Sequence, residues 1–340
     1  MTVTSEGQPA QTAVLGGGLL KADEYADFLA REYLAGYLPA GGAAVKVAVV
    51  GDDGAADRLE TGLASAAAGA QALYAPISAE STRVHMVDQI FLAISRAVDW
   101  EAVAAAHVRA AYEGAAFPVA DAADLSVTAV ARRHDVDGRE LYRSVRRLLE
   151  RGLLGNPAVV PEMGRAMLRL AQAQLGGGDI DPAEHDAVMS WLRGELKSIT
   201  ALRPALIYTR IGRHNARAML GSTAVLLLAA GWKGLVVQLD LSRLAAGRRP
   251  PAELRSGFYY SKAAVLDAYE VLRQFIDATD ELRGVLVVAV VPPELMTDET
   301  RGLPAYSALH LRVADEVRDR RRANPFAALV RLEVRLEAVA

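Results

Sequence analysis

The chain has 340 residues, which is enough for one large domain or two of ordinary size. Its formal net charge of -3 gives no global attraction to nucleic acid or to an anionic membrane surface. The absence of cysteine excludes disulfides, thiolate zinc sites and cysteine nucleophiles. Because neither a secretory signal nor an apolar run of membrane-spanning length is present, we expect a cytoplasmic protein.

The first 80 residues predict a leader followed by a strand–helix–strand unit. We expect residues 1–18 to form a flexible leader that ends in three consecutive glycines. Apolar side chains at helical spacing, a β-branched run and a glycine turn then follow one another. The predicted elements are a helix over 20–37, a strand over 45–50, a turn over 51–54, a helix over 55–68 and a strand over 71–76. This order is typical of a βαβ unit.

Residues 81–202 differ in character, because strand-like runs disappear and amphipathic helices dominate. The predicted helices cover 86–97, 100–112, 126–134, 139–151, 161–175 and 182–197. Helices and strands alternate again after Pro204. The predicted helices cover 215–230, 261–278 and 306–322, and the predicted strands cover 235–240, 285–291 and 327–336. We therefore predict an α/β fold in which 19–80 and 203–340 form a parallel sheet flanked by helices, with 81–202 as an all-helical insertion.

The glycine turn stands where a phosphate-binding P-loop would stand, between a buried strand and a helix. The motif reads G-x-x-x-x-G-K-[ST], and residues 51–58 read GDDGAADR. Ala56 replaces the second glycine, Asp57 the phosphate-binding lysine and Arg58 the magnesium-binding hydroxyl. A carboxylate about 4 Å from a phosphate charge costs on the order of 4 kcal/mol at an effective dielectric of about 20. Asp57 itself is a candidate to satisfy the helix N-terminus, and an ordinary strand-to-helix turn also explains this segment alone.

The strand over 235–240, LVVQLD, ends in an acid as a Walker B strand does. Asp240 takes the place of the magnesium-binding carboxylate, although an aspartate that only caps a strand explains it as well. Leu241 stands where a glutamate normally activates water, and leucine cannot be a base. We predict a degenerate nucleotide site without a catalytic residue, metal or cofactor, at which magnesium-ATP is disfavoured. Its residues are Gly51, Asp53, Gly54, Asp57, Arg58 and Asp240.

Five further segments share a pattern with one family. The first segment comprises Glu24-Tyr25, Phe28 and Tyr33 together with 41–46, and the second is Gly155-Asn156. The third comprises 211–216, Met219-Leu220 and 234–240, the fourth is 269–277, and the fifth is 318–325. With these segments the chain resembles the ATP-binding proteins of BREX phage-defence systems over about residues 20–336. The resemblance implies an AAA+ or related P-loop ATPase fold with a helical insertion. Because the chain departs from it at Ala56, Asp57, Arg58 and Leu241, we expect a pseudo-ATPase that binds partners.

Residues 126–149 are similar to a helix-turn-helix, with a turn near Asp135. The predicted inner face of the second helix carries Leu141, Val145 and Leu148. Its predicted outer face is basic, and the candidate DNA contacts are Arg139, Arg143, Arg146 and Arg147. A helical hairpin with a solvated basic face is the alternative interpretation.

A second arginine cluster ends the helix predicted over 306–322. Arg318, Arg320, Arg321 and Arg322 either balance the helix dipole or provide an arginine finger to the nucleotide of a neighbouring subunit. We therefore expect a protein partner, such as an ATPase or helicase encoded nearby, and a homo- or hetero-oligomer is plausible. An active ATPase with a non-standard site and a DNA-binding regulator remain the alternative functions, and no membrane is expected.

Overall fold

The computed structural model describes residues 19–120, 123–249, 251, 253, 256–314 and 323–333. The expected leader lies outside the described residues, as do Arg318, Arg320, Arg321 and Arg322. No helix in the described part of the chain is both long and apolar enough to cross a bilayer.

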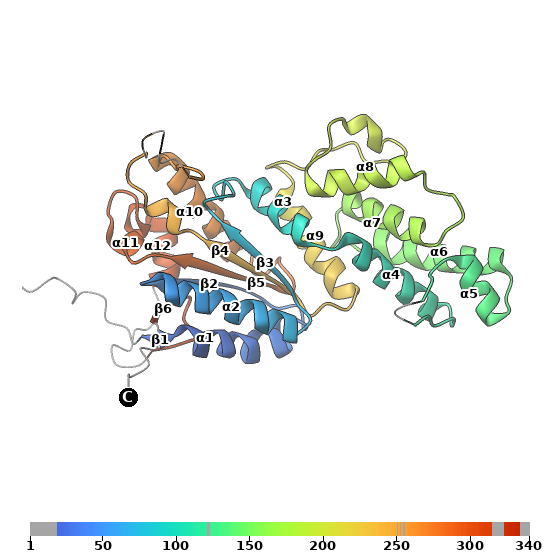
Figure 1. The fold of residues 1–340 in the computed structure, drawn as a ribbon, viewed down its shortest axis with the longest axis horizontal. Helices are drawn as coiled ribbons and strands as arrows, with labels where there is room; N and C mark the ends of the chain where they lie inside the picture. The colour runs from blue at the N-terminus through green and yellow to red at the C-terminus, as the bar shows by residue number, and fades with distance from the viewer. Residues whose placement is uncertain are drawn as a thin grey trace, which may run out of the picture.

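Six parallel strands form one sheet, which lies in the left half of the molecule in Figure 1. In chain order the strands are β1 (Leu20–Lys21), β2 (Ala43–Val50), β3 (Leu73–Ser78), β4 (Leu235–Asp240), β5 (Val285–Val291) and β6 (Leu329–Glu333). In space they run in the order β1-β6-β2-β5-β4-β3. The predicted α/β class is therefore confirmed, and the sheet is consistent with a P-loop NTPase-like fold.

The sheet is buried on both faces, which explains why its central strands are apolar at nearly every position. Because side chains alternate along a strand, Val47 and Val49 of β2 face one hydrophobic core, whereas Ala48 and Val50 face the other. All seven residues of β5 are buried in the same alternating manner.

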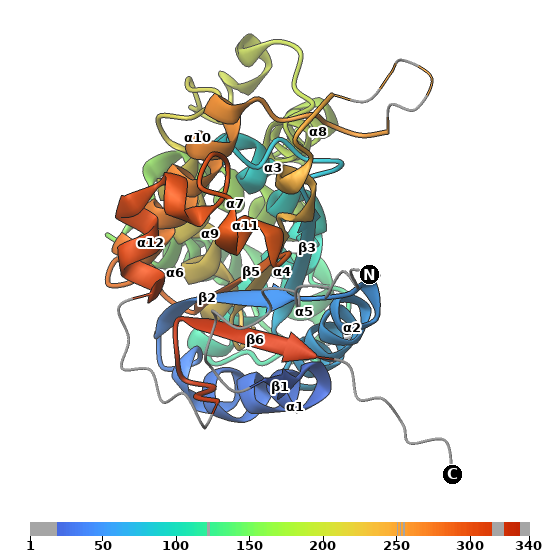
Figure 2. The ribbon, with the colours of Figure 1, turned by 90° about the vertical axis from the view of Figure 1, so that its left-hand side faces the viewer.

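Helices cover the two faces in separate layers (Figures 1 and 2). One layer consists of α1 (Ala22–Leu29), its π-helical continuation (Ala30–Tyr37) and α2 (Asp53–Gly69). The opposite core includes side chains of α3 (Val87–Ala97), α9 (Ala216–Ala229), α10 (Lys262–Asp277) and α12 (Ser307–Ala314). The four-residue α11 (Glu294–Thr297) follows β5.

The remaining helices pack beside the sheet, at the right of Figure 1. They are α4 (Trp100–Gly114), α5 (Val127–His134), α6 (Gly138–Leu154), α7 (Pro161–Gln174) and α8 (Pro182–Arg193). Helix α7 contacts α4, α6 and α8, so these helices share a core. They fall within the predicted helical insertion, although its bounds at residues 81 and 202 remain a prediction.

Several element boundaries differ from the sequence prediction. The helix predicted from residue 20 begins at Ala22, because Leu20 and Lys21 pair with β6. The turn predicted over 51–54 is shorter, because α2 already begins at Asp53. Helix α8 ends at Arg193 rather than at residue 197, since Gly194 adopts a left-handed conformation with φ +75°. The helix predicted over 306–322 begins at Ser307 and is described only to residue 314.

Candidate functional site

The strand order brings the two halves of the predicted nucleotide site to one edge of the sheet. Strand β5 lies between β2 and β4, and all three strands are parallel. Gly51 directly follows β2, and Asp240 ends β4, so both residues lie at the carboxyl edge. Two strand spacings of about 4.8 Å separate β2 from β4 by roughly 10 Å. Ligands of open parallel sheets bind at this edge.

The segment after β2 does not form a phosphate loop, because only Gly51 and Asp52 separate β2 from α2. Asp52 is the N-cap, and its side-chain oxygen accepts the backbone N–H of Ala55 at 2.9 Å. The sequence argument that Asp57 satisfies this helix end is therefore wrong. Asp52 was missed, although an aspartate just before an alanine-rich helix is a known N-cap signal.

The other predicted residues of this half-site lie within α2. Asp53 and Gly54 occupy its first turn, and Asp57 and Arg58 follow within the helix. All four residues are exposed to solvent. The backbone that wraps around phosphate in a P-loop is thus helical here, and its free end is occupied by a carboxylate.

Asp240 and Leu241 serve the turn that follows β4. One Asp240 carboxylate oxygen accepts the backbone N–H of Ser242 at 2.9 Å, and the other accepts the hydroxyl of Ser78 at 3.3 Å. The Leu241 side chain is 2% exposed, and its backbone N–H donates to the Val290 carbonyl at 2.8 Å. Asp240 therefore stabilises the turn after β4, and the buried Leu241 side chain has no group that could act as a base. Within the described residues, no three His, Asp or Glu side chains converge as metal ligands.

The predicted DNA-contact arginines lie on α6, which follows α5 after a short turn. Asp135 ends α5 in a left-handed conformation with φ +52°, and Asp137 caps α6. The buried stripe of α6 is formed by Leu141, Val145, Leu149 and Leu153. Leu148, predicted on the inner face, is only partly buried, and Leu149 takes its place.

Arginines form a second stripe on α6. Arg139, Arg143, Arg147 and Arg151 recur every fourth residue and are exposed. They are offset by two positions, about 200°, from the buried stripe and therefore lie on the opposite face. Arg146 differs from them, because its Nε lies 2.8 Å from a Glu150 carboxylate oxygen.

Two of the family-like segments have structural roles. In 211–216, the Asn215 side-chain oxygen accepts the Gly212 N–H at 2.9 Å, and the amide nitrogen donates to the Arg210 carbonyl at 3.0 Å. In 269–277, Glu270 accepts two hydrogen bonds from Arg273. These contacts hold the start of α9 and the surface of α10.

Comparison with known proteins gives one match. Neither the curated proteins nor the solved structures contain a significant match to this chain. The sequence model of the family described as BREX system ATP-binding protein BrxC/D matches residues 122–337. This region contains α5 to α12 and β4 to β6 and is more than half of the chain. The chain therefore belongs to the BREX system ATP-binding protein BrxC/D family.

Proposed function

We propose that this chain is a phage-defence component that does not hydrolyse ATP at the edge between β2 and β4 and instead acts by binding partners. Family membership supports a place in a BREX system. The observation that carries the loss of catalysis is the Asp52 cap on a helix that begins only two residues after β2.

Electrostatics at the amino end of α2 support the same proposal. An uncapped helix N-terminus attracts an anion with about 1 kcal/mol. Here Asp52 already occupies one of the free N–H groups, and Asp53 and Asp57 add negative charge on exposed turns. Repulsion between a phosphate and an exposed carboxylate is about 1 kcal/mol at roughly 4 Å, which offsets the attraction of the helix dipole. A triphosphate would therefore have to displace the cap and face uncompensated carboxylates.

The test is a magnesium-ATP turnover assay with the purified chain and an Asp240→Ala variant. We expect the same background rate from both, since Leu241 offers no base and Asp240 is bonded within its own turn. Circular dichroism must show that both chains are folded. A wild-type rate that disappears in the variant would establish ATP hydrolysis at this edge and overturn the proposal.

Partner binding is the positive half of the proposal. A subunit that keeps the sheet of an ATPase still presents the surfaces by which such ATPases assemble, so we propose an ATPase or helicase of the same defence system as the partner. The sequence supports an arginine finger in trans from Arg318, Arg320, Arg321 and Arg322, which lie outside the described residues.

DNA binding through α6 is the second candidate function. The specific observation in its favour is the stripe of Arg139, Arg143, Arg147 and Arg151 opposite the buried face. Such a stripe is about 18 Å long at 1.5 Å per residue, which is the length of several successive phosphates. This candidate is compatible with the first one, because α6 lies among helices beside the sheet.

A further inference from the structure

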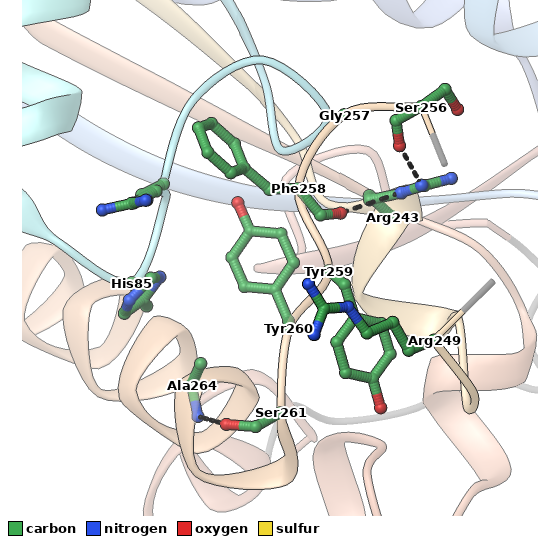
Figure 3. Close-up of a pocket in the computed structure, with 11 residues that line it drawn as sticks. His85, Arg243, Arg249, Ser256, Gly257, Phe258, Tyr259, Tyr260, Ser261 and Ala264 are labelled. Carbon is green, nitrogen blue, oxygen red and sulfur yellow. Dashed lines mark hydrogen bonds between the residues drawn. The ribbon is translucent and has the colours of Figure 1, made fainter. Parts of the chain in front are cut away.

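A pocket of about 570 Å³ (Figure 3) is lined by segments that follow β3 and β4, so it lies at the carboxyl edge of the sheet on the side away from β2. Three segments that are distant in sequence form it. They are the loop after β3, the 3-10 helix Ser242–Ala245 after β4, and residues 256–261 that lead into α10. The nearest strand ends are those of β3 and β4, so the pocket is distinct from the amino end of α2.

The lining of the pocket is cationic in a chain whose net charge is -3. Arg83, Arg243 and Arg249 line it together with His85, and no carboxylate is among the described lining residues. Burial lowers the pKa of His85, and Arg213 and Arg83 act in the same direction against Asp267 and Asp88. His85 is therefore neutral near pH 7 and offers a hydrogen bond, whereas the arginines supply the charge.

The guanidinium of Arg243 is held in place before any ligand arrives. Its Nε donates to the Phe258 carbonyl at 3.0 Å, and its Nη2 donates to the Ser256 carbonyl (Figure 3). A guanidinium has five N–H groups, so up to three remain for a ligand. The Arg83 guanidinium lies 5.0 Å from the centre of the Phe258 ring, which gives it a preferred orientation.

The backbone around the pocket is also fixed. The buried Tyr260 hydroxyl lies 2.8 Å from the Ala79 carbonyl and accepts the Val84 N–H at 3.3 Å, which anchors the loop that carries Arg83. Gly257, with φ +62°, passes so close to this loop that a Cβ would lie 2.5 Å from the Glu80 carbonyl oxygen. A preformed cavity with oriented donors costs less entropy on binding than a flexible one.

The chemistry of the pocket fits a phosphate ester that carries a planar group. Arginine pairs with phosphate through two parallel N–H groups. The cavity is within the usual range for small-molecule sites, about 300–1,000 Å³, and much larger than one phosphate needs. The Tyr259 ring, which is 37% exposed, provides an aromatic surface at its wall. We propose that this pocket binds a phosphorylated ligand of mononucleotide size, with its phosphate on Arg83 and its planar group on Tyr259.

The test is calorimetry of the full chain with adenosine monophosphate, adenosine and inorganic phosphate at low salt. We expect the monophosphate to bind and each of the other two to bind at least about tenfold more weakly, because each lacks one half of the recognised group. Arg83→Ala should weaken binding of the monophosphate at least about tenfold, and Tyr259→Ala severalfold. The matched control Arg31→Ala removes an exposed arginine from the π-helical segment after α1 and should leave the affinity unchanged.

Arg243 also supports the backbone, so its variant is interpreted only beside the Arg83→Ala and Tyr259→Ala variants. A 5′-phosphorylated single-stranded oligonucleotide distinguishes the two sources of such a ligand. Tighter binding than the monophosphate, with the same loss in Arg83→Ala, would identify a nucleic-acid strand as the source. No binding of either probe, or equal binding of inorganic phosphate, would overturn the inference. Binding that is lost in Asp240→Ala and retained in Arg83→Ala would place the ligand between β2 and β4, which would overturn this inference and leave the hydrolysis assay to test the proposed function.

Discussion

At the start of α2, the Asp52 carboxylate accepts the Ala55 N–H, and at the end of β4 the Asp240 carboxylate accepts the Ser242 N–H. Both distances are 2.9 Å. In an active P-loop protein the corresponding positions leave their donors and acceptors to phosphate and magnesium. Here both acids stabilise their own turns. At this carboxyl edge both carboxylates therefore already accept hydrogen bonds from their own chain.

The first residue-scale prediction concerns the cap. Asp52→Ala should lower the free energy of unfolding by about 1 kcal/mol, because the N–H of Ala55 loses its side-chain acceptor. Asp52→Ser keeps an acceptor at the cap without the charge and should cost a few tenths of a kcal/mol at most. Urea unfolding of the three chains measures the difference. Equal losses in both variants would show that the charge of Asp52, and not its hydrogen bond, matters.

Residue-level prediction succeeds where a residue follows directly from a strong element. Asp240 and Leu241 follow an unmistakable apolar strand, so their positions at the sheet edge could be predicted. The Asp52 cap could not be separated from Asp57, because the choice depends on the first residue of α2, and boundaries are the least regular part of a helix. The arginine pocket was also missed. Arg83 and Arg243 are 160 positions apart in sequence, and the pairing of β3 with β4 brings the segments that carry them to one pocket.

Helices α10 and α12 are joined by a polar network on their surfaces. Arg273 donates to both Glu270 carboxylate oxygens, at 2.6 and 2.7 Å, and the Tyr306 hydroxyl donates to the same carboxylate. Arg312 of α12 donates to Asp277 at the end of α10. The network fixes α12 against α10. It also gives the family-like segment 269–277 a structural role that requires no ligand.

The element-scale prediction follows from the titration of Glu270. Hydrogen bonds from Arg273, with smaller contributions from Tyr306 and Gln274, lower the pKa of Glu270 from 4.5 to about 2. A lowered pKa in the folded state stabilises the protein above pH 4.5, and this contribution is lost as the pH falls toward 2. Glu270→Gln should therefore lower the urea concentration at the midpoint of unfolding at pH 6. The difference between the variant and the wild-type chain should shrink as the pH falls from 4.5 to 2.5. Glu299→Gln, a change at an exposed acid, is the control and should show no such convergence.

Element prediction worked best where burial imposes a pattern. The apolar runs of β4 and β5 were predicted with the bounds that the structure shows, because strands buried on both faces contain little else than apolar residues. Strand β1 could not be predicted, since two residues have no periodicity and their partner β6 lies more than 300 positions away. The left-handed Gly194 sets a helix end that spacing alone did not predict, whereas the turn at Asp135 lies where the sequence placed it.

At the scale of the whole molecule, positive charge is concentrated in one segment of the chain. The chain carries a net charge of -3, whereas residues 126–154 contain seven arginines and four acids. The buried stripe of α6 packs against α4 and α7, so the arginine stripe faces away from the shared helical core. Net charge alone could not predict this surface. Helical spacing predicted it, because the same period places the leucines inside and the arginines outside.

The whole-molecule prediction is that any DNA binding depends on this stripe. Arg143→Ala combined with Arg147→Ala should weaken binding to all sequences alike, because contacts to phosphates do not read bases. Each lost phosphate contact should also reduce the dependence of log K on log salt by about 1, so the double variant should lose roughly 2 from the slope. Fluorescence anisotropy of a labelled duplex over a range of salt concentrations measures both quantities.

The control for this double variant is a second double variant that removes the same charge from another part of the chain. Arg31→Ala combined with Arg58→Ala removes two exposed arginines from the layer of α1 and α2, on the opposite part of the molecule from α6. If the field of the whole chain governs binding, both double variants weaken it to the same extent. If α6 contacts the phosphates, only its own variant lowers the slope, since counterions are released only where side chains neutralise the backbone. An unchanged affinity and slope in the α6 variant would remove the stripe from the DNA site and leave the hairpin with a structural role.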